Sequence, residues 1–339
     1  MSAPLSPPLK TIALFCSLLG LCQGAAADAP VLKLIAEVKG FASPESVAWD
    51  GSHYYVSNIG KELKPTDKDG DGFISRMDAK GENLQLKFIG NLNAPKGMVV
   101  VKNTLYVCDI DVLLGFDLVS KEKTFEISFA KDGVLLLNDV CAAEADKLLV
   151  SATDKNKVYL VDTAKQSFAE VAFDRAPNGP NGLLYTKQDN MRGMACLLVA
   201  EWGSNNLPNG NISGYMLDGT LLKAHFLNHS VDKKADSPMK DGYLDGIAGI
   251  FNQEGKPVGF LYSDWISLKP EGKLFWSGET PESVVSLDIP NGPAGGPADF
   301  FFDSKTSVLA LPCMLDNRVL LLNFSQRSAA SPISETTTD

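Results

Sequence analysis

Residues 44–57 read PESVAWDGSHYYVS, and this stretch sets the pattern from which the fold is predicted. A short segment, PESVAW, precedes a run rich in valine and tyrosine, HYYVS, with turn-forming residues between them. The arrangement recurs as PKGMVV before TLYVC, LNDVCA before KLLVS, PNGLLY before CLLVA, LDGIAG before GFLYS and PADFFF before VLALP. No long stretch has apolar residues at the 3.6-residue period of a helix. The sequence therefore predicts an all-β protein.

Six copies of this pattern predict a six-bladed β-propeller. The second residues of the six segments are Glu45, Lys96, Asn138, Asn181, Asp245 and Ala298, at intervals of 51, 42, 43, 64 and 53 residues. Repeats of about 40 to 50 residues, each holding four strands, are typical of propeller blades. The long fourth interval contains the polar stretches SNNLPNGNIS and NHSVDKKADSPMKDG, which we expect to project from one face. Pairing of VLKLIAEVKGF (31–41) with RVLLLNF (318–324) should close the ring and remove exposed sheet edges.

The two ends of the chain are predicted to lie outside the propeller domain, which covers residues 28–325. Residues 1–27 hold an apolar run, Thr11–Cys22, that is shorter than the roughly twenty residues of a membrane-spanning helix and is followed by three alanines. This pattern predicts a secretory signal peptide, and hence a periplasmic or secreted protein without a membrane span. The polar segment 326–339 is predicted to be a disordered C-terminal tail.

The charge of the chain bears on its partners. The 339 residues include 41 acidic and 31 basic side chains, which gives a net charge of −10. Such a field repels phosphate backbones, so we expect no nucleic-acid partner and look for a small-molecule ligand instead. Four cysteines follow the leader, three of them in strand-like apolar runs, and they are interpreted as buried thiols: Cys108, Cys141, Cys196 and Cys313.

The six equivalent positions should form a ring around the propeller axis. Residues at one position of successive blades lie at one height, and here four of them carry side-chain oxygens: Glu45, Asn138, Asn181 and Asp245. The other two members are Lys96 and Ala298. For any single member the alternative is that Asn-Asp, Asn-Gly or Asp-Gly is simply a turn dipeptide. Four oxygen-bearing side chains in one register weaken that alternative.

The second strand of each blade should end at the opening where the first strand begins, and we call this opening the mouth. The residues expected there are Asn58, Asp109, Asp111, Asp154, Glu201, Trp202, Asp264, Trp265, Asp316 and Asn317. They predict an acidic mouth with two indoles, suited to a cation and a neutral polyol or lactone. Oxygen ligands favour Ca²⁺, with Mg²⁺, Mn²⁺ or Zn²⁺ as alternatives. For Trp202 and Trp265, packing within the blades is the alternative to ligand binding.

The order of the motifs PESVAWD, DGDGFISR, NAPKGM, LLNDV, PNGL, YLDGI, YSDW and ADFFFD, from about Pro44 to Phe324, resembles the senescence-marker-protein (regucalcin) and gluconolactonase-like family, in particular its exported bacterial members. The resemblance implies a divalent cation on the axis, held by Glu45, Asn138, Asn181 and Asp245. It also implies that Asp245 is the catalytic base and that Asn138 touches substrate. One position differs, because Leu136 stands where sugar-lactonase members often carry arginine.

Together these features predict a metal-dependent hydrolase of a lactone or related ester. Asp245 would take a proton from the attacking water, and Lys96 would donate to the developing oxyanion or to a substrate hydroxyl. Trp202 and Trp265 would contact the substrate. An equally weighted role for Lys96 is to balance the charge of Glu45. The alternative function is a non-catalytic propeller, stabilised by its metal, that binds a small ligand or protein at the acidic mouth.

A second cation site is suggested by the stretch DKDGDGFISRMD, residues 67–78. It matches the twelve-residue calcium loop, with Gly72 at the sixth position and Asp at the twelfth in place of the usual Glu. The candidate ligands are Asp67, Asp69, Asp71, Phe73 through its carbonyl, Ser75 and Asp78. Against this, the flanks look like strands instead of helices, so an acidic turn within the first blade is an equally weighted interpretation.

Overall fold

Short alternating strands separated by glycine, asparagine and aspartate turns give a protein built almost wholly of antiparallel sheet. The computed structural model describes residues 30–186, 196–204, 207–216, 242–265, 271–278 and 284–325. Within these ranges the only helices are single 3₁₀ turns, Ala130–Asp132, Thr153–Lys155 and Met314–Asp316. In the part of the chain that is described, no helix has the length and apolarity needed to span a membrane.

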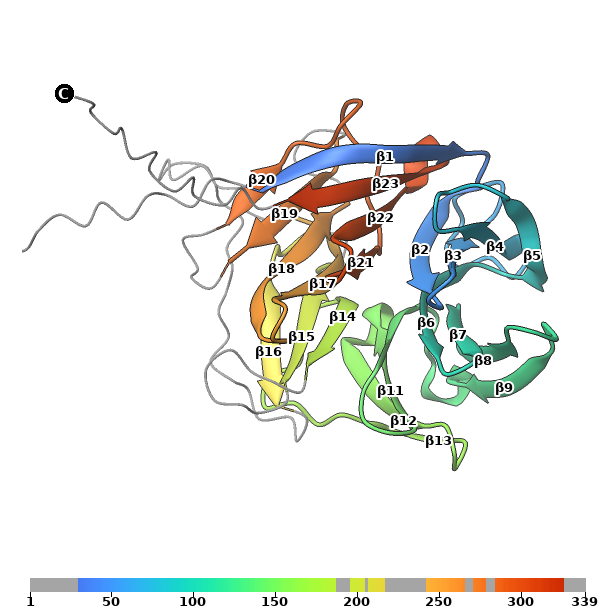
Figure 1. Ribbon diagram of the computed structural model, residues 1–339. Helices are drawn as coiled ribbons and strands as arrows, with labels where there is room; N and C mark the ends of the chain where they lie inside the picture. Colours follow the sequence, from blue (N-terminus) through green and yellow to red (C-terminus); the bar gives the residue numbers. More distant parts are fainter. Residues whose placement is uncertain are drawn as a thin grey trace, which may run out of the picture. The chain divides into compact units, whose positions relative to one another are not determined.

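The strands form six sheets, one for each blade, arranged as a β-propeller (Figure 1). Blade one contains β2 (Pro44–Trp49), β3 (His53–Asn58), β4 (Gly72–Asp78) and β5 (Gln85–Leu92). Blade two contains β6 (Pro95–Val101), β7 (Thr104–Asp109), β8 (Val112–Asp117) and β9 (Lys123–Ser128). Blade three contains β10 (Leu137–Ala142), β11 (Lys147–Ala152), β12 (Lys157–Asp162) and β13 (Ser167–Glu170).

The remaining three blades follow the same plan. Blade four has three described strands, β14 (Pro180–Thr186), β15 (Cys196–Glu201) and β16 (Ile212–Met216). Blade five contains β17 (Leu244–Phe251), β18 (Pro257–Asp264), β19 (Lys273–Ser277) and β20 (Val285–Leu287). Blade six contains β21 (Phe301–Asp303), β22 (Val308–Cys313), β23 (Arg318–Ser325) and β1 (Val31–Lys39). The predicted six-bladed propeller is therefore confirmed.

Blade six is completed by the first strand of the described chain, as expected from the sequence. β1 pairs antiparallel with β23 from Val31 opposite Ser325 to Lys39 opposite Arg318, with one irregularity between Leu34 and Ala36. Figure 1 shows the two strands side by side although they come from opposite ends of the domain. Because β1 takes the outermost place in the sheet, it joins the start of the propeller to its end.

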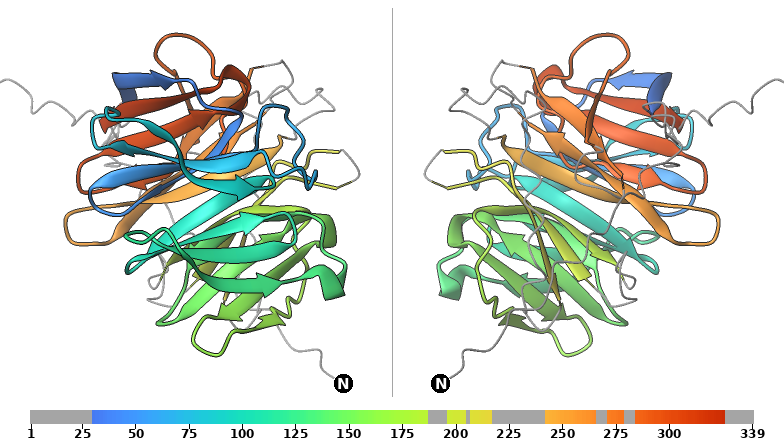
Figure 2. Two further views of the ribbon diagram at one scale, coloured as in Figure 1. Left: turned by 90° about the vertical axis from the view of Figure 1, so that its right-hand side faces the viewer. Right: turned by 90° about the vertical axis from the view of Figure 1, so that its left-hand side faces the viewer.

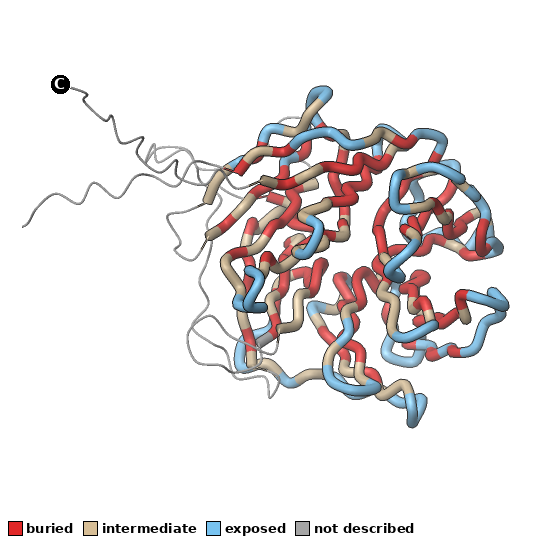
Figure 3. The backbone as a smooth tube through the Cα atoms, in the orientation of Figure 1, coloured by how far each residue is buried: buried red, intermediate tan, exposed pale blue. Residues whose placement is uncertain are grey.

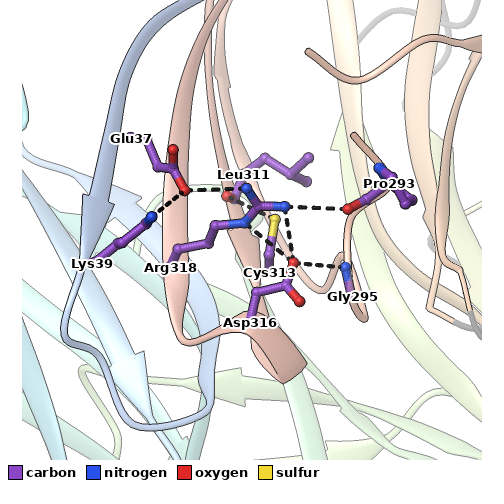
Figure 4. A network of polar contacts seen from close by, with 8 residues as sticks. All are labelled: Glu37, Lys39, Pro293, Gly295, Leu311, Cys313, Asp316 and Arg318. Atoms are coloured by element: carbon purple, nitrogen blue, oxygen red, sulfur yellow. Dashed lines mark hydrogen bonds and ion pairs between the residues drawn. The ribbon is translucent and has the colours of Figure 1, made fainter. Parts of the chain in front are cut away.

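Arg318 adds a side-chain link to this closure (Figure 4). Its guanidinium donates to Glu37 on β1 at 3.1 Å, to the carboxylate of Asp316 at 3.0 and 3.1 Å, and to the carbonyl oxygen of Pro293 at 3.2 Å. The hydrogen bond from Arg318, followed by that from Lys39, lowers the pKa of Glu37. A guanidinium with several donors in a fixed plane suits such a junction, since it satisfies acceptors from three segments at once.

The hydrophobic core is divided into layers between neighbouring sheets. Six apolar clusters of buried residues fill the six blade interfaces, for example Val47, Val56 and Met77 of blade one against Ala310 and Leu321 of blade six. Figure 2 shows the sheets stacked face to face in two further views. In Figure 3 the buried segments lie along the strands and the exposed ones on the outer turns. Each sheet is thus buried on both faces, and the innermost strands are held around a common axis.

Several sequence predictions fall on residues that the structure does not describe. The signal peptide 1–27, the tail 326–339 and most of the second polar stretch of the fourth interval lie outside the described ranges. Of the cysteines, Cys108 and Cys313 are buried free thiols and Cys141 is a half-buried one. The side chain of Cys196 lies outside the description.

Candidate metal and ligand site

Each predicted ring residue of the first five blades lies at a β-bulge of an innermost strand. In blade one, Pro44 pairs with Asn58 and Val47 with Val56, so two residues on β2 oppose one residue on β3. The same two-against-one register occurs at Lys96, Asn138, Asn181 and Asp245. A bulge bends its strand and redirects side chains. Five bulges at one height therefore mark the level where the propeller departs from regular pairing.

Serine side chains satisfy the backbone groups that three of these bulges release. The backbone N–H groups of Ser46, Asp139 and Gly246, each the second residue of its bulge, donate to serine hydroxyls on the adjacent strand at 2.8 to 2.9 Å. These acceptors are Ser57, Ser151 and Ser263, the residues directly opposite the bulges. Buried backbone donors need such partners. The serines in YVSN, LVSA and YSDW thus stabilise the geometry of the ring.

Glycines allow neighbouring innermost strands to approach one another at this height. A Cβ atom at Gly182 would lie 2.1 Å from the backbone oxygen of Asp245, and one at Gly97 would lie 2.6 Å from the backbone oxygen of Asn138. Asn181-Gly182 and Asp245-Gly246 lie inside β14 and β17. The interpretation of these pairs as turn dipeptides is therefore wrong, because their glycines are required for close contact between blades.

Unpartnered oxygen atoms are concentrated in the predicted ligand set. Glu45, Asn138, Asn181 and Asp245 are at most 9% exposed. One carboxylate oxygen of Glu45, the side-chain oxygen and nitrogen of Asn181, and one carboxylate oxygen of Asp245 are buried without a hydrogen-bond partner. A buried polar atom without a partner costs about 1–3 kcal/mol. A cation bound by these oxygens would remove that cost, so the residues present fit a hard divalent ion.

The electrostatics of the ring also favour a bound cation. Burial, and next the charge of Asp245, raise the pKa of Glu45 well above its ordinary value, while Lys96 opposes the rise. Burial and then the charge of Asp139 raise the pKa of Asp245. Carboxylates that disfavour ionisation because of their neighbours need a compensating positive charge. The ammonium group of Lys96 supplies only part of this positive charge.

Lys96 is fixed at the edge of the ring instead of projecting freely into the channel. Its side chain is 2% exposed, and its ammonium donates to the carbonyl oxygens of Ala94 at 2.9 Å and Pro65 at 2.7 Å. Burial lowers its pKa, and the charge of Glu45 is the main opposing influence. Through these two hydrogen bonds, Lys96 connects the loop that precedes β4 to the start of blade two. The two roles predicted for it, charge balance and donation to a substrate, are both compatible with this position.

The polar residues at the ends of the second strands have a role that the sequence analysis did not predict. In five blades one of them accepts a hydrogen bond from a backbone N–H located one or two residues before the innermost segment: Asn58 from Ala42, Asp109 from Ala94, Asp154 from Leu135, Asp264 from Tyr243 and Asp316 from Gly295. In blade four, Glu201 binds Asn209 and Ser213 instead. Two further mouth residues are also engaged, because Asp111 is paired with Lys68 and Asn317 accepts from the backbone N–H of Ser43. These side chains thus stabilise the start of five of the six blades.

Apolar side chains lie next to those polar residues in the sequence. Ile59, Ile110 and Met314 form a buried cluster with Ala94 and Ala298, and Trp265 packs against it. Ala298, the sixth ring position, therefore belongs to this buried apolar cluster.

The two predicted indoles lie together at blades four and five. The rings of Trp202 and Trp265 are 5.6 Å apart, and that of Tyr243 is 5.0 Å from Trp202. The indole nitrogen of Trp265 is buried without a partner. An aromatic group with an unpartnered donor is suited either to packing or to contact with a ligand that carries an oxygen.

The six candidates for a second cation site are not brought around one point. The first three candidates, Asp67, Asp69 and Asp71, lie in the loop before β4. There the Asp71 carboxylate accepts a hydrogen bond from the backbone N–H of Lys61, and the Asp69 carboxylate accepts one from the backbone N–H of Asp71. Residues 72–78 form the extended strand β4, so Asp78 lies roughly 20 Å from Gly72 at about 3.3 Å per residue.

The later candidates have other partners. Phe73 is buried within β4, where its carbonyl oxygen accepts from the Asn58 amide, and the Ser75 hydroxyl donates to the Leu86 carbonyl inside the blade. Asp78 accepts from the backbone N–H groups of Lys80 and Glu82. The corresponding aspartates Asp117 and Asp162 form similar turns in blades two and three. A single twelve-residue calcium loop is therefore not formed.

Two buried carboxylates beside the ring were missed by the sequence analysis. Asp139 and Asp299 each follow a ring position, Asn138 and Ala298, by one residue. Asp139 accepts from the backbone N–H groups of Val140 at 2.6 Å and Leu183 at 2.7 Å, and burial raises its pKa to about 6. Asp299 accepts from the hydroxyl of Ser46. Their signal was present in the segments LNDVCA and PADFFF, where an aspartate stands at the third position, directly after the ring position.

Within the described ranges, no group of three or more His, Cys, Asp and Glu side chains is placed to hold a metal ion. The predicted set contains two carboxylates and two carboxamides, so this observation does not bear on it. It does indicate that any ion at the ring depends on the amide oxygens of Asn138 and Asn181.

Comparisons with known proteins bear on the fold alone. No protein-family model matches the chain, and no curated protein matches its sequence. Among solved structures it is similar to a hydrazine synthase of Kuenenia stuttgartiensis, with a TM-score of 0.53 and 14% identity over 81% of this chain and 75% of the other.

Two further similar structures are U3-55K and the WD40 repeats of RRP9. Each has a TM-score of 0.53 and 10% identity. The matches cover 82% and 83% of this chain, and 80% and 79% of the other chains, respectively. At such low identities these likenesses support the propeller fold and carry no information about activity.

Proposed function

We propose that the protein is a divalent-metal-dependent hydrolase of a lactone or related ester, with Ca²⁺ as the favoured ion. The observation that carries the proposal is the set of buried, unpartnered oxygens on Glu45, Asn181 and Asp245. Together with the amide oxygen of Asn138, they would hold the ion. A divalent cation bound there supplies Lewis-acid stabilisation of the negative charge that develops when water adds to a carbonyl carbon.

The chain itself would move the proton. Asp245 is the proposed general base: burial and then the charge of Asp139 raise its pKa in the metal-free chain, and a bound cation would favour the ionised form that accepts a proton. It would take the proton of the attacking water and return it to the alkoxide released when the ester bond breaks. General-base assistance of this kind contributes roughly 10² to 10⁴ in rate.

The surroundings of the ring bear on the substrate. Leu136 is half-buried and stands at the position where sugar-lactonase members of the family that this sequence resembles often carry arginine. Trp202 and Trp265 lie together at the mouth and offer aromatic rings to a ligand. We therefore expect a lactone or aryl ester with an apolar substituent to be a better substrate than a sugar-acid lactone.

The test is hydrolysis of a panel of lactones and aryl esters, with Ca²⁺ present and after chelation. We expect turnover that is lost with chelator and restored by Ca²⁺, and lost in Asp245→Asn with the fold retained by circular dichroism. Asp264→Asn is the matched control, since Asp264 is also a buried carboxylate at the mouth but binds a backbone N–H group. Turnover that persists in Asp245→Asn would remove the assigned base. Calcium binding without turnover on any substrate would favour the non-catalytic propeller instead.

A further inference from the structure

A cavity of about 1070 Å³ occupies the half of the central channel that lies away from the ring. It is lined by the middle and later parts of innermost strands and by the exposed turns after β17 and β21, including Asn252 and Lys305. None of the ring residues Glu45, Lys96, Asn138, Asn181 and Asp245 lines it. Its volume is in the range of small-molecule sites in proteins. It is therefore separate from the proposed metal site and opens on the opposite face.

The walls of this cavity are apolar. Side chains such as Val99, Leu184, Ala248 and Phe301 line it; each packs against one of the clusters between the blades and is itself only half-buried. Half-buried apolar side chains in the interior of a channel present hydrophobic surface to whatever fills it. A ligand body with apolar surface would gain roughly 25 cal/mol for each Å² it removes from water.

Two carboxylates line the same cavity at its inner end, Asp139 on blade three and Asp299 on blade six. Blades three and six are opposite one another in a six-bladed ring. Donors on the innermost strands fix both groups: backbone N–H groups hold Asp139, and the hydroxyl of Ser46 holds Asp299. An ionised carboxylate has about four acceptor sites, so each retains capacity to accept from a ligand.

Neither carboxylate has a cationic partner in the described part of the chain. The ion pairs found there include neither Asp139 nor Asp299, and Lys305 at the outer rim forms none with them. The buried ammonium of Lys96 donates to the carbonyl oxygens of Pro65 and Ala94 and forms no ion pair with either carboxylate. Burial raises the pKa of Asp299 well above its ordinary value, so its negative charge is disfavoured, and a positively charged ligand head beside it would favour the ionised form.

We propose that this cavity is a second ligand site, which binds an organic ammonium ion with an apolar body. The ammonium head would lie at the inner end near Asp139 and Asp299, and the body against the apolar walls. An anionic ligand is excluded by the two carboxylates, and a neutral one would leave them uncompensated. This assignment does not require the proposed hydrolase activity, because none of the proposed metal ligands lines the cavity. The two sites are neighbours, however, since Asp139 and Asp299 both act on the pKa of Glu45.

The test compares three probes of similar shape by calorimetry: cyclohexylmethylammonium, cyclohexylmethanol and cyclohexanecarboxylate. We expect the ammonium ion to bind at least tenfold more tightly than the alcohol, and the carboxylate to show no binding. The titration is repeated in saturating Ca²⁺ to distinguish the two sites. Ca²⁺ would displace an ammonium probe bound at the ring, but not one bound in the cavity. Equal affinity for the ammonium ion and the alcohol, absence of ammonium binding, or complete displacement by Ca²⁺ would each overturn the proposal.

Variants locate the bound probe. Asp299→Asn should weaken ammonium binding at least tenfold and leave alcohol binding unchanged, whereas Ala248→Phe should weaken both by occupying part of the cavity. Asp264→Asn, which changes a buried carboxylate outside the cavity, should bind like the parent protein. If Asp299→Asn fails to fold, Ala248→Phe and the Ca²⁺ competition still decide the question. Unaltered ammonium binding in Ala248→Phe would contradict the assigned location.

Discussion

The hydroxyl of Ser46 donates to a carboxylate oxygen of Asp299 at 2.5 Å, and so joins blade one to blade six across 253 residues of sequence. Hydrogen bonds to a charged acceptor are shorter and stronger than neutral ones. This bond lies at the level of the ring, on the axial side of the blades. The propeller is therefore closed twice, by β1 and β23 at the periphery and by a polar contact near the axis.

Ser46→Ala should destabilise the protein by about 1–3 kcal/mol, because it leaves the Asp299 carboxylate without its side-chain donor. Urea unfolding followed by tryptophan fluorescence measures the change. Ser52→Ala is the matched control, because Ser52 is exposed on a turn of the same blade. Equal stabilities of the two variants would show that the contact to Asp299 contributes nothing.

Gly182→Ala should distort the ring at Asp245. The added Cβ would lie 2.1 Å from the backbone oxygen of Asp245, so β14 or β17 must shift. We expect calcium affinity to fall more than tenfold by calorimetry, with loss of at least about 2 kcal/mol in urea unfolding. Gly90→Ala, where nothing lies within 4 Å of the new atom, should bind calcium like the parent. Normal affinity in Gly182→Ala would argue against a site at this height.

Asp264 should make stability depend on pH. Burial raises its pKa to about 7, against the opposing hydrogen bond from Tyr243 and the charge of Lys273. Between about pH 4 and pH 7 the folded protein holds a proton that the unfolded chain has released, so the free energy of unfolding decreases as pH rises through this window.

Asp264→Asn should remove this dependence, because the amide oxygen can still accept from Tyr243. The gain should be on the order of 4 kcal/mol at pH 8 and near zero at pH 4. Urea unfolding at both pH values checks this, with the exposed Asp288→Asn as control. A variant whose stability falls by the same amount as the parent between pH 4 and pH 8 would refute the assignment to Asp264.

Arg318→Met should weaken the closure of the ring by about 1–3 kcal/mol, since it leaves Glu37, Asp316 and the Pro293 carbonyl without their shared donor. Lys39→Met, at a side chain that is 72% exposed and pairs with the same Glu37, should change stability by less than about 0.5 kcal/mol. A double-mutant cycle with Glu37→Gln isolates the contact between β1 and β23. Purely additive effects in that cycle would show that the two side chains are not coupled.

The sequence by itself determined the blade count, the closing strands and the height of the ring. These features are local and repeated: strand-forming runs, turn residues and one register position recur six times, so each copy supports the others. Glu45, Asn181 and Asp245 could be selected in this way because a shared position in successive repeats implies a shared place around the axis.

The tertiary structure alone decided which polar groups remain without a partner. Asp109, Asp245 and Asp264 are the same residue type at the same end of their blades, yet Asp109 and Asp264 accept backbone N–H groups while one oxygen of Asp245 does not. Whether a donor lies within reach depends on how an incoming loop packs against a neighbouring strand, and a linear pattern does not contain that distance. The same reason separates Asp78 from Asp71, because an extended strand lies where the motif implied a closed loop.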